Sequence, residues 1–319
     1  MKKMMRLLAA LLLAMGIAMV SCSAEDTAAM RVGGLKGPTG MALAHMMTEN
    51  NGAYEFTLAG APDELTGQII QGNVDVAAVP VNLGAVLYNK TQGGVQALSL
   101  ITRGMLYVLE KGDSIQSVAD LQGKTIVTAG QGATPEYVMN YILQSNGVEA
   151  TLDFKSEHAE VTTLALNGMA DVVLVPEPHA TTLRMKDDSY RVALDITEEF
   201  ARAASANGYP QAQLSMSVVI VRTAFAQEHP QQVAQFMADL EASIAFANEN
   251  VDAAAQEIAD QGIIASAAVA KQALPSCRLV FVAGAEMQAQ AAPLYEILFA
   301  ANPASVGGTL PDAGYFYMQ

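Results

Sequence analysis

The sequence has no tryptophan and only two cysteines, Cys22 and Cys277, among its 319 residues. Without tryptophan, a ligand pocket cannot be built on an indole platform, which disfavours a bulky planar ligand. If Cys22 carries a lipid, as the N-terminus indicates below, no partner remains for an internal disulfide. The stability of the fold must then come from an apolar core, and 51% of the residues are hydrophobic.

Positive charge is also scarce, because the sequence has 17 Lys and Arg but 32 Asp and Glu, which gives a net charge of −15. A surface of this kind repels phosphate backbones, so we expect no nucleic-acid partner. An anionic ligand is still allowed, since the local field inside a pocket can oppose the net charge.

Motifs of common enzyme and metal sites are missing. The four histidines, His45, His158, His179 and His229, form neither an H-x-x-x-H pair nor a cluster with cysteine, so no metal site is expected. Residues 34–40 match neither the dinucleotide-binding G-x-G-x-x-G pattern nor a P-loop, and no G-x-S-x-G elbow occurs. We therefore expect no cofactor and no enzymatic activity.

The N-terminus has the pattern of an export signal. Lys2, Lys3 and Arg6 precede an apolar run over residues 7–20. This run is shorter than the roughly 20 residues that a membrane-spanning helix needs, but it fits the apolar core of a signal peptide.

The end of this run resembles a bacterial lipobox. Residues 19–22 read MVSC, with Met where leucine is usual. The resemblance implies that residues 1–21 are removed, that Cys22 carries a lipid and that residues 22–29 form a tether to the cell membrane. The protein would then be extracytoplasmic. The alternative is ordinary cleavage near Ala24, which would discard Cys22.

The most informative pattern is an internal repeat. Residues 72–80 (GNVDVAAVP) and 168–176 (GMADVVLVP) both read G-x-x-D-V-x-x-V-P. In each copy the glycine is suited to end a helix and the aspartate to a turn. The valine-rich run that follows is typical of a buried parallel strand, and its proline ends the ladder.

Each copy closes a longer unit in which strands alternate with helices. The expected strands are 30–35, 54–58 and 76–80 in the first unit, and 125–129, 151–154 and 172–176 in the second. This alternation predicts an α/β fold with mostly parallel sheets and right-handed crossovers.

Two further β-rich runs, 98–110 and 214–222, stand on either side of the second unit. The simplest topology inserts lobe 2 (111–215) into lobe 1 (30–110 and 216–319). The two runs then cross between the lobes as a two-strand hinge.

Three segments carry a family resemblance. Residues 120–124 read DLQGK, residues 175–180 read VPEPHA and residues 222–230 read RTAFAQEHP. In this order they resemble bacterial solute-binding proteins of the nitrate/sulfonate/taurine and thiamine-pyrimidine-precursor type. The resemblance covers essentially the whole mature chain. It implies a two-lobed periplasmic-binding fold (type II, cluster C) that serves an ABC importer, with a permease and its ATPase as partners.

Ligands of open parallel sheets bind beyond the carboxyl ends of the strands. The loops expected there are 36–40, 59–62 and 80–83 in lobe 1, and 130–135, 156–159 and 176–180 in lobe 2. Each loop opens a helix, whose free N–H groups attract polar or anionic groups. We therefore expect a small polar or anionic organic ligand, bound by a monomer.

The candidate contacts in and beside these loops are Lys36, Gly37, Thr39, Gly40, Gly60, Asn82, Gly132, Thr134, Tyr137, His158 and Glu177. The lysine offers a cation, the hydroxyls and the amide offer hydrogen bonds, and the glycines allow close backbone approach. Glu177 is suited to recognise an amine or a hydroxyl. Each residue also has a structural alternative, such as a helix cap for Thr39, Thr134 and Asn82, or a hinge ion pair for Glu177.

These observations favour the solute-binding subunit of an importer. Two alternatives stay open, namely an enzyme of the same fold (lyase or precursor-synthase type) and an exported sensor subunit that presents its ligand to a receptor. An enzyme would need a reactive residue in the cleft and measurable turnover.

Overall fold

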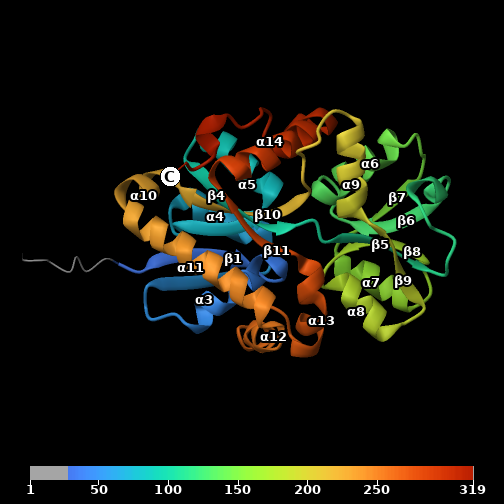
Figure 1. Ribbon diagram of the computed structural model, residues 1–319, viewed down its shortest axis with the longest axis horizontal. Coiled ribbons are helices and arrows are strands. Elements are labelled where there is room, and N and C mark those ends of the chain that lie inside the picture. Colours follow the sequence, from blue (N-terminus) through green and yellow to red (C-terminus); the bar gives the residue numbers. More distant parts are fainter. Residues whose placement is uncertain (1–27, 319) are drawn as a thin grey trace, which may run out of the picture.

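The computed structural model describes residues 28–318 as two lobes, each built on one β-sheet (Figure 1). The expected signal peptide, Cys22 and most of the expected tether lie outside the described residues. Within residues 28–318, no helix combines the length and the apolar character needed to cross a membrane.

Lobe 1 contains a six-stranded sheet of order β11-β4-β10-β3-β1-β2. Its strands are β1 (Met30–Leu35), β2 (Tyr54–Ala59), β3 (Val76–Pro80), β4 (Val95–Arg103), β10 (Ser215–Arg222) and β11 (Leu279–Ala283). Helices α4 (Pro62–Gln71), α5 (Val81–Lys90) and α14 (Gly284–Ala301) pack on one face. The other face carries α2 (Pro38–Met41), α3 (Ala44–Thr48), α10 (Thr223–Glu228), α11 (Pro230–Glu249), α12 (Val251–Asp260) and α13 (Ala267–Cys277). Two short 3₁₀ turns, η2 (Pro303–Val306) and η3 (Ala313–Tyr315), follow α14.

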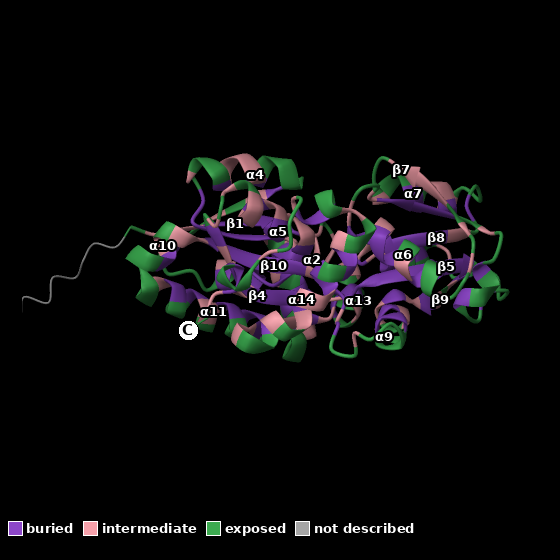
Figure 2. Cartoon of the chain, turned by 90° about the horizontal axis from the view of Figure 1, so that it is seen from above, coloured by how far each residue is buried: buried purple, intermediate pink, exposed green. Residues whose placement is uncertain are grey.

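Lobe 2 contains a five-stranded sheet of order β7-β6-β8-β5-β9. Its strands are β5 (Leu106–Lys111), β6 (Thr125–Ala129), β7 (Thr151–Lys155), β8 (Val172–Pro176) and β9 (Tyr190–Asp195). Helices α6 (Thr134–Ser145) and α9 (Ile196–Ala206) pack on one face, and α7 (His158–Leu166) and α8 (His179–Lys186) on the other. A short turn η1 (Val118–Leu121) precedes β6. Figure 2 shows the buried sheets running through both lobes between more exposed helices.

The internal repeat forms equivalent parts of the two lobes, as predicted. Its copies become β3 and β8, and each lies antiparallel to one neighbour and parallel to another. Helix α4 ends directly before Gly72, and α7 ends two residues before Gly168. The φ angles of these glycines, 75° and 71°, favour glycine. The α/β class is therefore confirmed. The sheets are mixed rather than mostly parallel, because β1–β3 and β6–β8 pair in parallel, whereas every pair that includes β4, β5, β9, β10 or β11 is antiparallel.

The run 98–110 is two strands rather than one crossing strand. β4 ends at Arg103 in the sheet of lobe 1, and β5 begins at Leu106 in the sheet of lobe 2. The chain therefore changes sheet at Gly104, earlier than the boundary expected at residue 110. A Cβ at Gly104 would lie 2.3 Å from the Thr197 hydroxyl and 2.9 Å from Leu214, so this passage packs tightly against the returning chain.

The two aspartates of the repeat have opposite surroundings. Asp75 is only 4% exposed and accepts hydrogen bonds from the Arg31 Nε at 2.8 Å and the Arg222 Nη1 at 3.2 Å. Asp171, at the matching position of lobe 2, is exposed. The buried carboxylate links β1, β3 and the end of β10 in lobe 1.

We predict that Asp75→Asn lowers the free energy of unfolding by about 2 kcal/mol, because charge-assisted hydrogen bonds to two guanidinium groups are weakened. Asp171→Asn is the matched control and should change it by less than about 0.5 kcal/mol. Urea unfolding followed by circular dichroism measures both. Equal losses in the two variants would contradict the role given to Asp75.

Candidate ligand-binding cleft

A cleft of about 360 Å³ lies between the lobes. Both sheets point the carboxyl ends of their parallel strands toward it. The lining residues come from the segments after β1, β2, β3, β6, β7 and β8, from the start of β10, and from the passage between β4 and β5. They are Lys36, Gly37, Pro38, Thr39, Pro62, Pro80, Asn82, Met105, Gly130, Ala133, Thr134, Pro135, His158, Pro176, Glu177, Pro178, His179, Met216 and Ser217.

Seven of the eleven candidate contacts meet in this cleft. They are Lys36, Gly37, Thr39, Asn82, Thr134, His158 and Glu177. They come from both halves of the repeat, so residues far apart in the chain are brought to one cavity. Whether they contact a ligand stays a prediction.

The other four candidates are not among the lining residues. Gly40 packs α2 against β1, since a Cβ there would lie 2.6 Å from the Leu35 carbonyl oxygen. The backbone N–H groups of Gly60 and Gly132 each donate a hydrogen bond to a glutamate side chain of the following helix. Tyr137 is buried, and its hydroxyl accepts a hydrogen bond from Asn302 at 3.2 Å.

The polar residues expected as helix caps have other partners. The capping positions are Gly37, Pro80 and Ala133, and none of their helices has a side-chain cap. Asn82 and Thr134 lie inside their helices instead, and the Thr134 hydroxyl donates to the Asn82 Oδ1 at 3.3 Å. The Thr39 hydroxyl lies 3.3 Å from that of Ser217. These side chains therefore point across or along the cleft.

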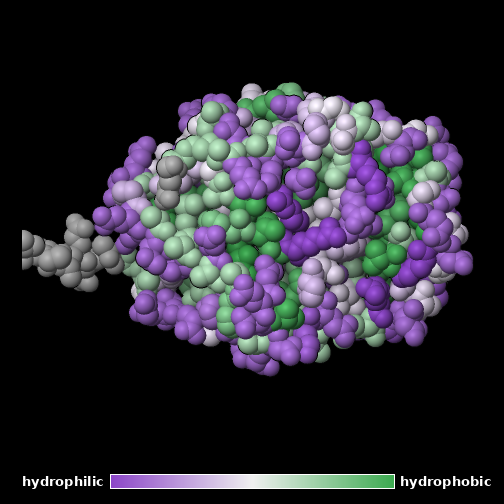
Figure 3. Space-filling view, viewed as in Figure 1, coloured by the Kyte–Doolittle hydropathy of each residue, from purple (hydrophilic) through white to green (hydrophobic). Residues whose placement is uncertain are grey.

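Further contacts hold the lobes together beside the cleft. Arg278, after α13 of lobe 1, forms an ion pair with Asp195 at the end of β9 in lobe 2. The Tyr107 hydroxyl of lobe 2 donates to the Ser276 carbonyl oxygen at 3.0 Å. Figure 3 shows hydrophilic side chains gathered along the junction between the lobes on this face. Together with the Asn82–Thr134 bond, these contacts describe a closed arrangement.

Charge is distributed unevenly in the cleft. Lys36 is exposed and stands on the side of lobe 1. Glu177, on the side of lobe 2, is only 3% exposed, and one of its oxygens accepts the Thr181 N–H at 3.1 Å. Loss of solvent raises the pKa of Glu177, while its hydrogen bonds to Thr181 partly oppose the shift.

Two histidines stand together on lobe 2. The rings of His158 and His179 are 5.7 Å apart between centroids. Burial lowers the pKa of His158 to about 4, and repulsion from His179 adds to the shift. Burial lowers the pKa of His179 as well. Both rings are therefore neutral near pH 7, and the buried Nδ1 of His158 has no hydrogen-bond partner among the described residues.

Sequence reasoning missed three lining residues at the hinge: Met105, Met216 and Ser217. They stand where the chain enters or leaves a sheet, and only pairing between distant strands places them at the cleft. No local pattern marks them. Within residues 28–318, no three His, Cys, Asp or Glu side chains are grouped as metal ligands. Cys277 is a buried free thiol, and burial raises its pKa.

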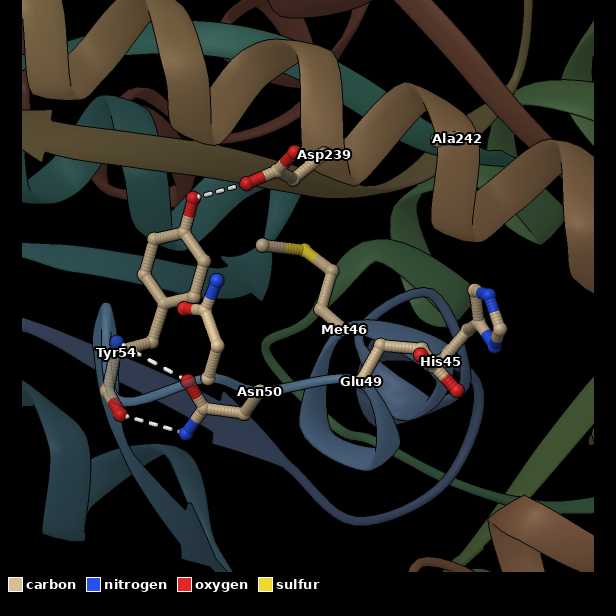
Figure 4. A pocket seen from close by; sticks show the side chains of 8 residues that line it. His45, Met46, Glu49, Asn50, Tyr54, Asp239 and Ala242 are labelled. Atoms are coloured by element: carbon tan, nitrogen blue, oxygen red, sulfur yellow. Dashed lines mark hydrogen bonds between the residues drawn. The ribbon is translucent and has the colours of Figure 1, made fainter.

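A smaller cavity of about 230 Å³ lies within lobe 1, between α3 and α11 (Figure 4). The Tyr54 hydroxyl donates to Asp239 at 2.5 Å, and Asn50 bonds to the backbone of Tyr54 at 2.8 Å. These groups already satisfy one another. The cavity also adjoins the start of β2, at the amino ends of the parallel strands, whereas the cleft lies at their carboxyl ends. It is therefore the weaker ligand site.

Comparison with known families finds one match. The model of the family described as NMT1/THI5 like matches residues 94–254, just over half of the chain. This segment includes both passages between the sheets and all of lobe 2. Comparison with curated protein sequences finds no match.

Solved structures resemble the chain over nearly its whole length. An ABC transporter protein from Parabacteroides distasonis is 21% identical over 92% of this chain and 99% of its own, with a TM-score of 0.78. The periplasmic aliphatic sulphonate binding protein SsuA of Escherichia coli is 16% identical over 91% and 92%, with a TM-score of 0.70. The alkanesulfonate-binding protein SsuA of Xanthomonas axonopodis pv. citri, bound to MOPS, is 17% identical over 89% and 95%, with a TM-score of 0.63. The two lobes therefore have the periplasmic-binding-protein fold.

We predict that His158→Asn flattens the loss of stability in acid. The pKa of His158 is about 4 in the folded chain, against an ordinary value of 6.5. Between these values only the unfolded chain takes up the proton, so stability is full above pH 6.5 and falls toward pH 4. Removing the ring should reduce this slope by up to about 1.4 kcal/mol per pH unit. Urea unfolding from pH 7 to pH 4 measures it, and identical slopes would refute the assignment.

We predict that Arg278→Gln opens the lobes, because it removes the charge that pairs with Asp195 across the junction. Small-angle X-ray scattering of the ligand-free protein should show a larger radius of gyration. Arg202→Gln is the matched control, since Arg202 pairs with Glu198 and Glu199 inside one helix of lobe 2. An unchanged radius for Arg278→Gln would show that other contacts hold the closed form.

Proposed function

Because the chain belongs to the NMT1/THI5-like family, we propose that it is the extracytoplasmic solute-binding component of an ABC importer. The lobes close around a small organic molecule, and the closed form delivers it to a permease that is driven by an ATPase. The single observation that carries this proposal is the cleft, where loops from both halves of the repeat face each other across two chain passages.

The two lobes would act as a clamp on the ligand. Polar groups from opposite lobes, such as Asn82 and Thr134, lie within 3.3 Å of each other. A ligand between the lobes touches both faces only when they are closed, so its binding energy favours the closed form. Neighbours of the same fold that are named as sulfonate-binding proteins support this role.

Attachment to the membrane is part of the proposal. Removal of residues 1–21 and lipidation of Cys22 would leave a short tether ahead of β1, which begins at Met30. The protein would then act as a monomer at the outer face of the cell membrane, next to its permease. Mass spectrometry of the protein from its native membrane tests this through the mass added to Cys22.

The test of ligand capture uses the mature protein without residues 1–21. Native mass spectrometry should reveal a co-purified small molecule, and calorimetry with that molecule should give a dissociation constant near micromolar, about −8 kcal/mol. Incubation should return the molecule unchanged, because the proposal includes no reaction. Turnover would favour an enzyme, and absence of any bound molecule from every preparation would contradict the proposal.

We predict that Asn82→Ala combined with Thr134→Ala weakens binding of the co-purified molecule about tenfold, because the two faces of the clamp lose polar groups at their closest approach. Asn51→Ala, in the smaller cavity of lobe 1, is the matched control and should bind like the wild type. Calorimetry compares the three proteins. Equal affinity in all of them would remove this cleft as the binding site.

A further inference from the structure

Three of the helices that begin at the cleft carry an acidic side chain of the protein in their first turn. Helices α4, α6 and α7 carry a glutamate at their third position, namely Glu64, Glu136 and Glu160. Each accepts the backbone N–H of the residue just before the helix cap, at 3.3 Å for Gly60, 2.5 Å for Gly132 and 3.1 Å for Ser156.

This pattern changes the expected charge of the ligand. The partial positive charge of a helix start attracts anions only while it is not neutralised. In α4, α6 and α7 a glutamate stands in the first turn and weakens this attraction, and the start of each helix contributes a residue to the cleft. The three glutamates themselves do not line the cleft, and Glu64 and Glu160 are exposed. At α8 the carboxylate of Glu177 takes the same place by accepting the Thr181 N–H. These charges disfavour a strongly acidic group in the cleft, above all at Glu177, the one of the four that lines it.

Little positive charge remains to compensate. Lys36 is the only lysine or arginine among the lining residues, and it is exposed at the side of lobe 1. The histidines of the cleft are neutral near pH 7, as described above. Two other helices begin at the cleft. Helix α2 has only four residues, and the start of α5 keeps its partial positive charge, because its first turn holds no acidic residue.

Two buried polar groups on lobe 2 keep unused hydrogen-bonding capacity, although Thr181 donates to Glu177 and the charge of Arg184 acts on it. Among the described residues, Glu177 forms no ion pair, and its hydrogen bonds to Thr181 leave acceptor capacity on a carboxylate that is 3% exposed. A buried carboxylate is costly unless donors surround it. The Nδ1 of His158 is also unsatisfied. Both residues line the same cavity, so one ligand can serve both.

Apart from Thr39, Asn82, Thr134 and Ser217, the rest of the cleft is largely apolar. Prolines and methionines from both lobes dominate the lining: Pro38, Pro62, Pro80, Pro135, Pro176, Pro178, Met105 and Met216. Its volume of about 360 Å³ lies at the lower end of the roughly 300–1,000 Å³ range of small-molecule sites. This surface suits a compact ligand with an apolar body and few polar groups.

We propose that the cleft selects a small nitrogenous molecule, uncharged or carrying one positive charge, which donates an N–H group to Glu177, and that it rejects alkanesulfonates. The inference rests on the proposed function and decides between the polar and the anionic ligands that the sequence left open. Glu177 and His158 satisfy the polar end of the ligand, and the prolines and methionines enclose its body.

The test uses probes that share a body and differ in their polar group. One series is benzamide, benzamidine and benzenesulfonate, and the other is butanamide, butylamine and butanesulfonate. Thermal unfolding and calorimetry are run on the mature protein after bound molecules have been removed. At least one amide, amidine or amine should raise the unfolding temperature, and neither sulfonate should do so.

Glu177→Gln should weaken binding of the stabilising probe about 10- to 100-fold, in line with the strength of a hydrogen bond to a charged group. Glu149→Gln is the matched control, an exposed glutamate outside the lining residues. Since Glu177 is buried, urea unfolding first checks that the variant folds. If it does not fold, His158→Ala takes its place and should weaken the same probe.

The outcomes separate this inference from the proposed function. Binding of a sulfonate, or of no nitrogenous probe, overturns the ligand class and leaves the solute-binding role standing if a co-purified molecule is still found. Equal affinity of Glu177→Gln and the wild type removes Glu177 as the contact. Failure of both the probes and the co-purified fraction to bind defeats the proposed function itself.

Discussion

The close approach of two chain passages at Gly104 is the constraint on which the molecule depends. The outgoing chain passes there from β4 into β5, and it packs against Thr197 at the start of α9 and against Leu214 of the returning chain. No side chain fits between them. The two passages therefore join the sheets at one point. The carboxyl ends of their parallel strands therefore stay directed at the same space.

Local patterns in the sequence predicted much of this architecture. The repeated G-x-x-D-V-x-x-V-P motif identified β3 and β8, since a glycine that ends a helix and a valine-rich run before proline each have a local physical meaning. The loops of the cleft followed from the rule that ligands bind beyond the ends of parallel strands. Seven of the candidate residues lie in the cleft for this reason.

What the sequence could not supply depends on contacts between distant segments. The run 98–110 looks continuous, and its division at Gly104 becomes visible only when the returning chain packs against it. Met216 and Ser217 reach the cleft because β10 pairs with β3, far away in sequence. The glutamates of α4, α6 and α7 do not depend on distant contacts. An acidic residue three positions after a helix cap is a local signal that can be recognised in the sequence.

The ion cluster around Asp75 has a mechanical consequence. If Cys22 is the membrane anchor, any pull on the tether enters the protein through β1, which is held between β2 and β3 and fastened by Arg31 to Asp75. Arg222 extends this fastening to β10. Lobe 2 has no such attachment at the matching Asp171. A force from the membrane would then act on lobe 1, and lobe 2 would be the lobe that moves when the cleft opens and closes.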